Sequence, residues 1–80
     1  MFENSIMTYY YTAKLKEELG RNIMRLRKKK GLKQVEVAVE AGINTSYYGK
    51  IERGIVNPSL EKLYRIVKAL HIQASDILPF

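Results

Sequence analysis

From residue 13 onward, apolar and polar positions alternate along the chain with the period of an α-helix. A first set of apolar residues recurs at intervals of four, four and three, which places them on one helix face. These residues are Leu15, Leu19, Ile23 and Leu26. Thr12 is a suitable N-cap, and Gly31 is a residue type that commonly follows a helix C-terminus. The pattern therefore predicts a first helix from residue 13 to about residue 30.

Further helical segments follow at short intervals. The pattern predicts helices over Gln34–Ala41 and Thr45–Glu52, and a longer helix that Ser59 caps and that ends at Leu70. A last turn over Ala74–Leu78 closes the chain. The inward stripe expected for the longer helix is Leu60, Leu63, Tyr64, Val67 and Leu70. Short connections and the absence of strand alternation predict an all-α fold, a compact five-helix bundle.

Residues 1–12 differ from the rest of the chain. They contain four of the eight aromatic residues and no basic residue, and the run Tyr9–Tyr11 favours extended structure. We expect a leader that is loose or that packs against the domain or a neighbouring chain. The expected organisation is therefore a leader over 1–12 and one domain over 13–80.

The segment from residue 34 to residue 53 has the spacing of a helix-turn-helix. Two short helices that cross steeply need a small residue at the contact, and Ala38 is placed there. Gly42 tolerates the positive φ that the turn requires, and Asn44 can cap the second helix. The shared apolar face is expected to consist of Val37, Ala41, Ile43, Tyr48 and Ile51.

Charge and composition narrow the function. The 80 residues carry a formal net charge of +6, which favours a polyanionic partner, nucleic acid before an anionic membrane surface. No cysteine is present and His71 is the single histidine, so we expect no metal, no cofactor and no catalytic triad. No apolar run is long enough for a membrane span, and no secretory signal is evident. We therefore expect a cytoplasmic protein that is not an enzyme.

Residues 19–78 resemble the phage repressor/Cro-type helix-turn-helix family. The matching positions are Leu19-Gly20, Ile23, Leu26-Arg27, Gly31-Leu32, Gln34, Ala38, Gly42, Ile51-Glu52-Arg53-Gly54, Pro58-Ser59 and Leu70. Ser46-Tyr47 and Ile51-Glu52-Arg53 are also similar to the small controller proteins of restriction–modification systems. The resemblance implies a lambda-repressor-like bundle whose third helix enters the major groove of DNA.

The resemblance also implies the residues that contact DNA. Thr45, Ser46, Gly49 and Lys50 are expected at the bases, where hydroxyls and an ammonium group can read base edges. Phosphate contacts are expected from Arg27, Lys33, Gln34, Tyr47, Arg53 and Asn57. Arg27 and Glu52 correspond to a family ion pair. We expect this pair to orient the third helix, and Arg27 near the DNA backbone, rather than to stabilise the fold. Lys33 replaces the usual capping Ser or Thr, which should cost about 1 kcal/mol.

A regulator of this size is expected to act by its own concentration and to bind two half-sites as a homodimer. The apolar C-terminal residues expected at the dimer interface are Ile72, Ile77, Leu78 and Phe80. Glu36 and Glu40 lie one turn apart and form either a solvated acidic edge or a contact for RNA polymerase. The alternative function is an antitoxin-type module that binds a toxin partner as well as DNA.

Overall fold

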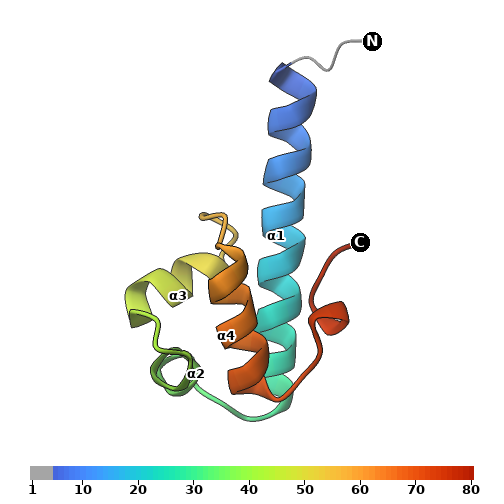
Figure 1. Cartoon of the computed structure of the whole chain (residues 1–80). Helices are drawn as coiled ribbons and strands as arrows, with labels where there is room; N and C mark the ends of the chain where they lie inside the picture. Colours follow the sequence, from blue (N-terminus) through green and yellow to red (C-terminus); the bar gives the residue numbers. More distant parts are fainter. Residues whose placement is uncertain (1–4) are drawn as a thin grey trace.

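The computed structural model describes residues 5–80, and four α-helices and a short 3-10 turn account for most of this range (Figure 1). The elements are α1 (Ser5–Lys29), α2 (Gln34–Ala41), α3 (Thr45–Glu52), α4 (Leu60–Leu70) and η1 (Ala74–Asp76). The predicted all-α class is confirmed, as are the bounds of α2 and α3. The count of five helices is wrong by one, because the last element is a single 3-10 turn.

Helix α1 begins earlier than the pattern predicted. It starts at Ser5, passes through Tyr9–Tyr11, and contains Thr12 in its interior, so neither an extended tyrosine run nor a Thr12 cap is found. The strand preference of tyrosine is weak, and extending an existing helix adds one hydrogen bond for each residue fixed. Residues 1–4 of the expected leader lie outside the described residues. The rest of the leader continues α1 beyond the body of the domain (Figure 1).

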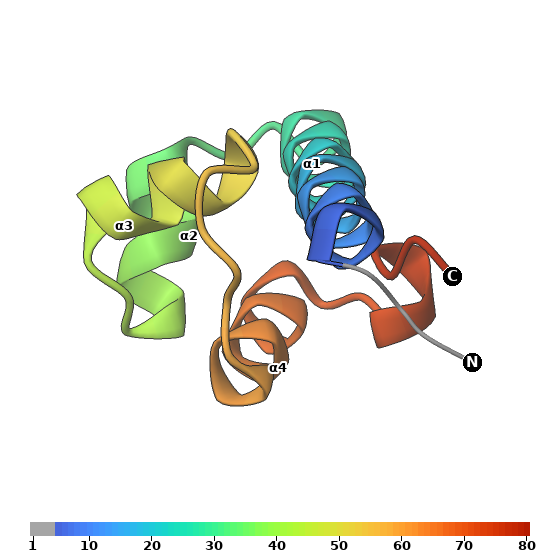
Figure 2. The same ribbon diagram turned by 90° about the horizontal axis from the view of Figure 1, so that it is seen from above.

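The core lies between α1 and the other three helices, with α2 and α3 on one side and the C-terminal segment on the other (Figure 2). Asn22 Nδ2 donates to the Ile77 carbonyl at 2.9 Å, which fixes the C-terminal segment to α1. The largest fully buried side chains come from every α-helix and from the C-terminal segment: Ile23, Val37, Tyr48, Ile51, Ile66, Leu70 and Ile77.

Two residues of the stripe predicted for α4 face solvent instead of the core. Leu60 is 83% exposed and Tyr64 is 61% exposed, whereas Ile66 and Ala69 are buried in their place. Leu60 is the first residue of α4 and lies at the edge of the body, and the buried face follows the adjacent stripe of the helix. The predicted helix is confirmed, and the predicted inward face is wrong at Leu60 and Tyr64.

The helix-turn-helix forms as predicted. Gly42 ends α2 with φ +69°, in the left-handed region, and Ala38 is fully buried where the helices cross. The Ile43 N–H donates to the Ala38 carbonyl at 2.9 Å, so the turn is closed by the backbone. Asn44 Oδ1 accepts from the Tyr47 N–H at 3.0 Å and caps α3. The caps therefore fix the direction in which α3 leaves the turn.

Over residues 5–80, none of the helices is both long enough and apolar enough to cross a membrane.

Candidate nucleic-acid interface

Helix α3 has a buried face and an exposed polar face. Tyr48 and Ile51 are buried in the core, whereas Thr45, Ser46 and Lys50 are exposed. The capped N-terminus of α3 lies at the outer edge of the body (Figure 2). The three exposed side chains bring two hydroxyls and one ammonium group to one surface, and these groups can donate to base edges and phosphates.

A concave surface adjoins this face of α3. Ser46, Tyr47 and Lys50 line it together with the turn of the helix-turn-helix and with Lys62 of α4. Lys62 Nζ lies 5.4 Å from the centre of the half-buried Tyr47 ring, a cation–π distance. Lys62 lies outside the helix-turn-helix motif, so no pattern in the sequence pointed to it, and only the tertiary packing of α4 brings it next to α3.

Gly49 does not lie on the exposed face. It is buried, and a Cβ added to it would meet Gln34 Oε1 at 3.6 Å and an Arg53 guanidinium nitrogen at 3.4 Å. Its small size therefore makes room for the start of α2 and for Arg53. The base contact expected of Gly49 stays a prediction, and the structure gives the residue a packing role.

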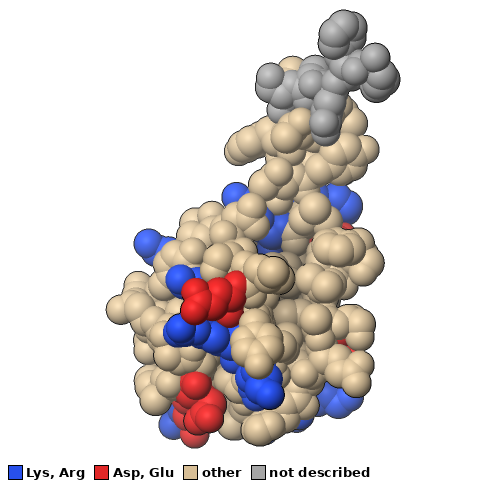
Figure 3. Space-filling model, in the orientation of Figure 1, with Lys and Arg blue, Asp and Glu red and all other residues tan. Residues whose placement is uncertain are grey.

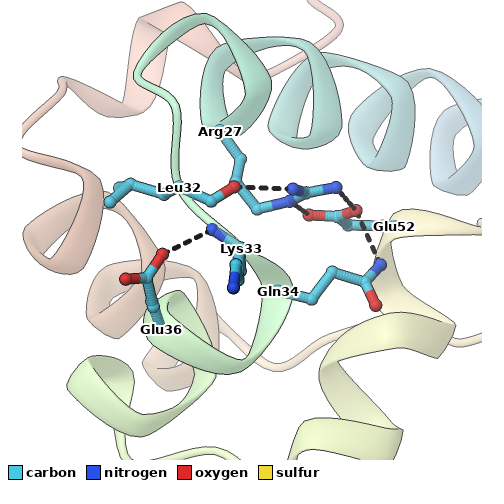
Figure 4. A network of polar contacts seen from close by, with 6 residues as sticks. All are labelled: Arg27, Leu32, Lys33, Gln34, Glu36 and Glu52. Atoms are coloured by element: carbon cyan, nitrogen blue, oxygen red, sulfur yellow. Dashed lines mark hydrogen bonds and ion pairs between the residues drawn. The ribbon is translucent and has the colours of Figure 1, made fainter.

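The ion pair between Arg27 and Glu52 is present, but it is buried (Figure 4). Arg27 Nε donates to Glu52 Oε2 at 2.6 Å, and the Nη2 atom donates to Oε1 at 3.0 Å. Nη1 donates to the Leu32 carbonyl at 2.8 Å. All three guanidinium nitrogens have protein partners and Arg27 is only 8% exposed, so the residue has a structural role. Nη1 and Nη2 each keep a second N–H, and the phosphate contact of Arg27 stays a prediction.

The same cluster shifts the pKa of its members. Burial acts to raise the pKa of Glu52, but hydrogen bonds from Arg27 and Gln34 outweigh it and hold that pKa below its usual value. The hydrogen bond to Glu52 raises the pKa of Arg27. Burial, followed by the nearby Glu52 carboxylate, raises the pKa of Tyr48. Arg27 and Glu52 are therefore both charged at neutral pH, and Tyr48 keeps its proton.

The N-terminus of α2 is tied to the same pair. Gln34 Nε2 donates to Glu52 Oε1 at 2.9 Å, so the side-chain amide group predicted to hold a phosphate is already engaged (Figure 4). Lys33 supplies no side-chain cap, as expected. Glu36 Oε1 accepts from the Lys33 N–H at 2.7 Å, which compensates part of the missing cap. Glu36 therefore caps the start of α2, a structural role beyond the predicted solvated acidic edge.

The remaining predicted phosphate contacts lie on the surface. Arg53 is exposed at the C-cap of α3, one turn beyond Lys50. Lys33 is exposed at the start of α2. Asn57 is exposed too, but it lines a cleft with Leu15 of α1 and the C-terminal segment, away from the concave surface beside α3.

The predicted dimer residues divide into three groups. Ile77 is fully buried in the chain's own core and has no exposed surface to offer a second chain. Ile72 packs partly against the core, and Leu78 is half-buried. Phe80 is exposed. Leu78 also lines an apolar groove with the exposed residues Leu60 and Tyr64, which the sequence analysis had placed in the core.

The architecture defines an all-α helix-turn-helix domain in which α3 presents a polar face to the outside. Residues 23–77 match the family described as Helix-turn-helix, and the chain belongs to this family. An uncharacterized helix-turn-helix-type transcriptional regulator, y4dJ of Sinorhizobium fredii, is 34% identical over 64 residues, which cover 80% of this chain and 83% of that protein. The chain is a DNA-binding transcription regulator of the helix-turn-helix type.

Controller proteins are among its relatives. The control protein C.BamHI of Bacillus amyloliquefaciens is 36% identical over 62 residues, which cover 76% of each chain. The crystal structure of the restriction-modification controller protein C.AhdI from Aeromonas hydrophila matches with a TM-score of 0.76 and 34% identity. That match covers 78% of this chain and 94% of C.AhdI. The similarity thus extends over most of each of these small proteins.

Proposed function

We propose that this protein is a sequence-specific regulator that binds a palindromic or pseudo-palindromic operator as a homodimer. One observation carries the proposal: α3 is capped and held by buried contacts while Thr45, Ser46 and Lys50 extend from it into solvent. A rigid helix with short polar side chains at its N-terminal half suits the major groove. The protein acts by binding alone, in the cytoplasm, with no cofactor.

The DNA contacts divide into two kinds. Thr45, Ser46 and Lys50 contact base edges, and Lys33, Tyr47 and Arg53 contact phosphates on either side. Asn57 and the backbone at the start of α2, where Gln34 begins the helix, remain proposed phosphate contacts. Lys62 joins this set because it lines the same concave surface as Lys50.

The dimer is supported by the apolar surface at the C-terminal end of the chain. With Ile77 removed from the predicted set, the contact is made by Ile72, Leu78 and Phe80, next to the groove that Leu60 and Tyr64 line. A homodimer places two copies of α3 on successive half-sites. The similarity to controller proteins supports control of transcription, including that of its own gene, by protein concentration.

Selection of random duplex DNA against the purified protein at near-physiological salt tests the proposal. We expect two related half-sites whose centres lie about 10 base pairs, or a multiple of one helical turn, apart. Enrichment of a single half-site contradicts the dimer and leaves specific binding intact. No enrichment, with binding that disappears as salt rises, contradicts sequence specificity.

Two partner proteins remain proposals. Glu40 is exposed on α2 and is a candidate contact for RNA polymerase, whereas Glu36 is engaged at the cap. A Glu40→Ala variant that binds DNA normally and activates transcription normally would exclude that contact. An antitoxin-type module would bind a toxin through an exposed apolar surface, and a small protein that co-purifies with the chain would favour this alternative.

A further inference from the structure

The N-terminal part of α1 forms an arm that extends beyond the body of the domain. The arm, defined here as residues 5–13, continues the axis of α1 past the level of the other helices (Figure 1). It lies outside residues 23–77, the part of the chain that matches the family. The arm is therefore an addition whose function the helix-turn-helix does not explain.

The arm exposes an apolar and aromatic stripe. Ile6 is 78% exposed, Tyr9 is 76% exposed and Tyr10 is 54% exposed, and the half-buried Ala13 follows them. The spacing i, i+3, i+4, i+7 places these four residues on one face of the helix. Further along α1, Leu19 and Ile23 are buried in the core. Among the described residues, Ile6, Tyr9 and Tyr10 thus stay exposed in the single chain, whereas Leu19 and Ile23 are covered by the body.

The arm has no charged side chain. Residues 5–13 contain no acidic or basic residue, and the charged residues of α1 begin at Lys14. Figure 3 shows Lys, Arg, Asp and Glu over the body, while the visible part of the arm below the grey atoms carries neither colour. DNA has no cation to contact on the arm, and a charged partner has no complement there.

An uncharged stripe of this kind suits a second copy of the same chain. The formal net charge of +6 makes two copies repel each other, so a homotypic contact forms most easily where the surface is neutral and far from the basic residues. An identical stripe on a second copy meets this condition and covers the exposed apolar side chains.

We propose that the arms of two copies pair with each other through Ile6, Tyr9, Tyr10 and Ala13. This inference rests on the proposed function, because it assumes that the protein binds DNA as a pair of copies. The two arms run antiparallel, because this orientation keeps the two basic bodies at opposite ends, whereas a parallel pair would bring them side by side. In the antiparallel register Ile6 lies opposite Ala13 of the second copy, and Tyr9 lies opposite Tyr10.

This register places the two domains at a spacing that suits DNA. Helix α3 meets α1 at Gly20, where a Cβ would lie 2.5 Å from the carbonyl oxygens of Ile51 and Glu52. With a rise of 1.5 Å per residue, the two Gly20 levels in the pair are about 32 Å apart. Successive half-sites one helical turn apart are about 34–36 Å apart. The α1–α3 contacts of two copies joined by their arms are therefore separated by about one helical turn of DNA.

Sedimentation velocity of the full chain between 1 and 100 µM tests the arm contact. The variant Ile6→Gln/Tyr10→Gln keeps good helix formers and changes no charge. We expect this variant to lose one association step that the wild type shows. The dissociation constant of that step should rise at least tenfold. Val39→Gln is the matched control, since Val39 is an exposed apolar residue on α2, and it should behave as the wild type. An arm variant that assembles like the wild type overturns the inference.

The same series separates this inference from the proposed dimer. A Leu78→Gln/Phe80→Gln variant tests the C-terminal surface. If the arm variant loses an association step and the C-terminal variant does not, the arm contact stands and the C-terminal interface fails. If only the C-terminal variant loses a step, the dimer stands and the arm contact fails. A wild type that remains monomeric at 100 µM, with and without DNA, overturns both.

Disulfide cross-linking tests the orientation, because the chain has no cysteine of its own. In Ile6→Cys/Ala13→Cys the two cysteines of one helix are about 10 Å apart along the axis, too far to pair within a chain. We expect this variant to form a covalent dimer under mild oxidation and Ile6→Cys alone to stay monomeric on non-reducing gels. Cross-linking of Ile6→Cys alone would overturn the antiparallel arrangement.

Discussion

At the scale of single residues, the buried pair of Arg27 and Glu52 connects the elements that must hold α3. Arg27 belongs to α1, Glu52 ends α3, and Gln34 begins α2, so one cluster joins three helices (Figure 4). Resemblance to the family predicted the pair itself. Its burial and the bond to the Leu32 carbonyl depend on tertiary packing, and they give Arg27 a structural role that the resemblance alone did not show.

We predict that Glu52→Gln lowers the free energy of unfolding by about 3 kcal/mol at pH 7, because it leaves the Arg27 charge buried without its partner. Urea unfolding followed by circular dichroism measures this. The pair of Lys14 and Glu18 on α1, whose side chains are 52% and 33% exposed, offers the control: Glu18→Gln should change stability by less than about 0.5 kcal/mol. Equal effects of the two substitutions would contradict the structural role of Glu52.

The effect of Glu52→Gln also depends on pH in a defined direction. Because the folded-state pKa of Glu52 lies below the ordinary value of 4.5, its contribution is fully present above about pH 4.5. It is lost as the pH falls through the folded-state pKa, since the unfolded chain binds the proton more readily. The difference in stability between wild type and variant should therefore shrink when unfolding is measured at pH 3 instead of pH 7.

For Lys50 we predict a loss of base specificity. Lys50→Ala should weaken operator binding by about 1–3 kcal/mol and relax the preference at one base pair, if the ammonium group contacts a base edge. Fluorescence anisotropy on a panel of operator variants measures both effects. Lys68→Ala on α4 removes the same charge and should leave the preference unchanged. An equal loss on every sequence would reassign Lys50 to a phosphate contact.

At the scale of elements, the close approach of α1 and α3 depends on Gly20. Gly20 is one of the positions that match the family, but the sequence alone offers no physical reason for a glycine there. The structure supplies one, since backbone carbonyl oxygens of Ile51 and Glu52 occupy the space that a side chain would need. No sequence pattern within α1 could indicate this contact, because the two residues are about 30 positions away in the chain.

We predict that Gly20→Ala destabilises the domain by about 2–3 kcal/mol and weakens operator binding, because it forces α3 away from α1. Gly31→Ala is the comparison: it has open space around it but a φ of +73°, so only backbone strain of about 1 kcal/mol is expected. Operator binding should survive that substitution at temperatures where the domain is folded. A Gly20→Ala domain as stable as the wild type would contradict the close contact.

The start of α2 can be improved. Lys33→Ser supplies the side-chain acceptor that Lys33 lacks, while Glu36 keeps its bond to the residue-33 N–H, and this should stabilise the domain by about 1 kcal/mol. For a domain of this size, that corresponds to a rise in Tm of about 5 °C. Lys33→Ala removes the lysine without adding an acceptor, so an equal rise for both variants would contradict capping.

At the scale of the whole molecule, the positive charge serves the binding of DNA over a broad surface. We predict that operator affinity falls with salt and that Arg53→Ala reduces the slope of log K against log salt by about 2 for a dimer, one phosphate contact in each copy. Arg65→Ala is the matched control, since Arg65 is occupied by Glu61 and the Gly42 carbonyl. Affinities measured over a range of salt concentrations report the Arg53 contact, whereas affinities measured on operator variants report the Lys50 contact. An unchanged slope in Arg53→Ala would exclude the Arg53 contact.

The sequence by itself determined the all-α class, the helix-turn-helix from residue 34 to residue 53, and its caps. These features depend on local physics: helical periodicity, the αL turn at Gly42, and side-chain caps at Asn44 and Ser59. Tertiary structure decided what each face of those helices touches. It buried Gly49 and Ile77, engaged Arg27 inside the protein, and exposed Leu60 and Tyr64. Helix α1 also extends beyond the body as an arm. Each added residue completes a backbone hydrogen bond of the helix, whether or not the domain covers it.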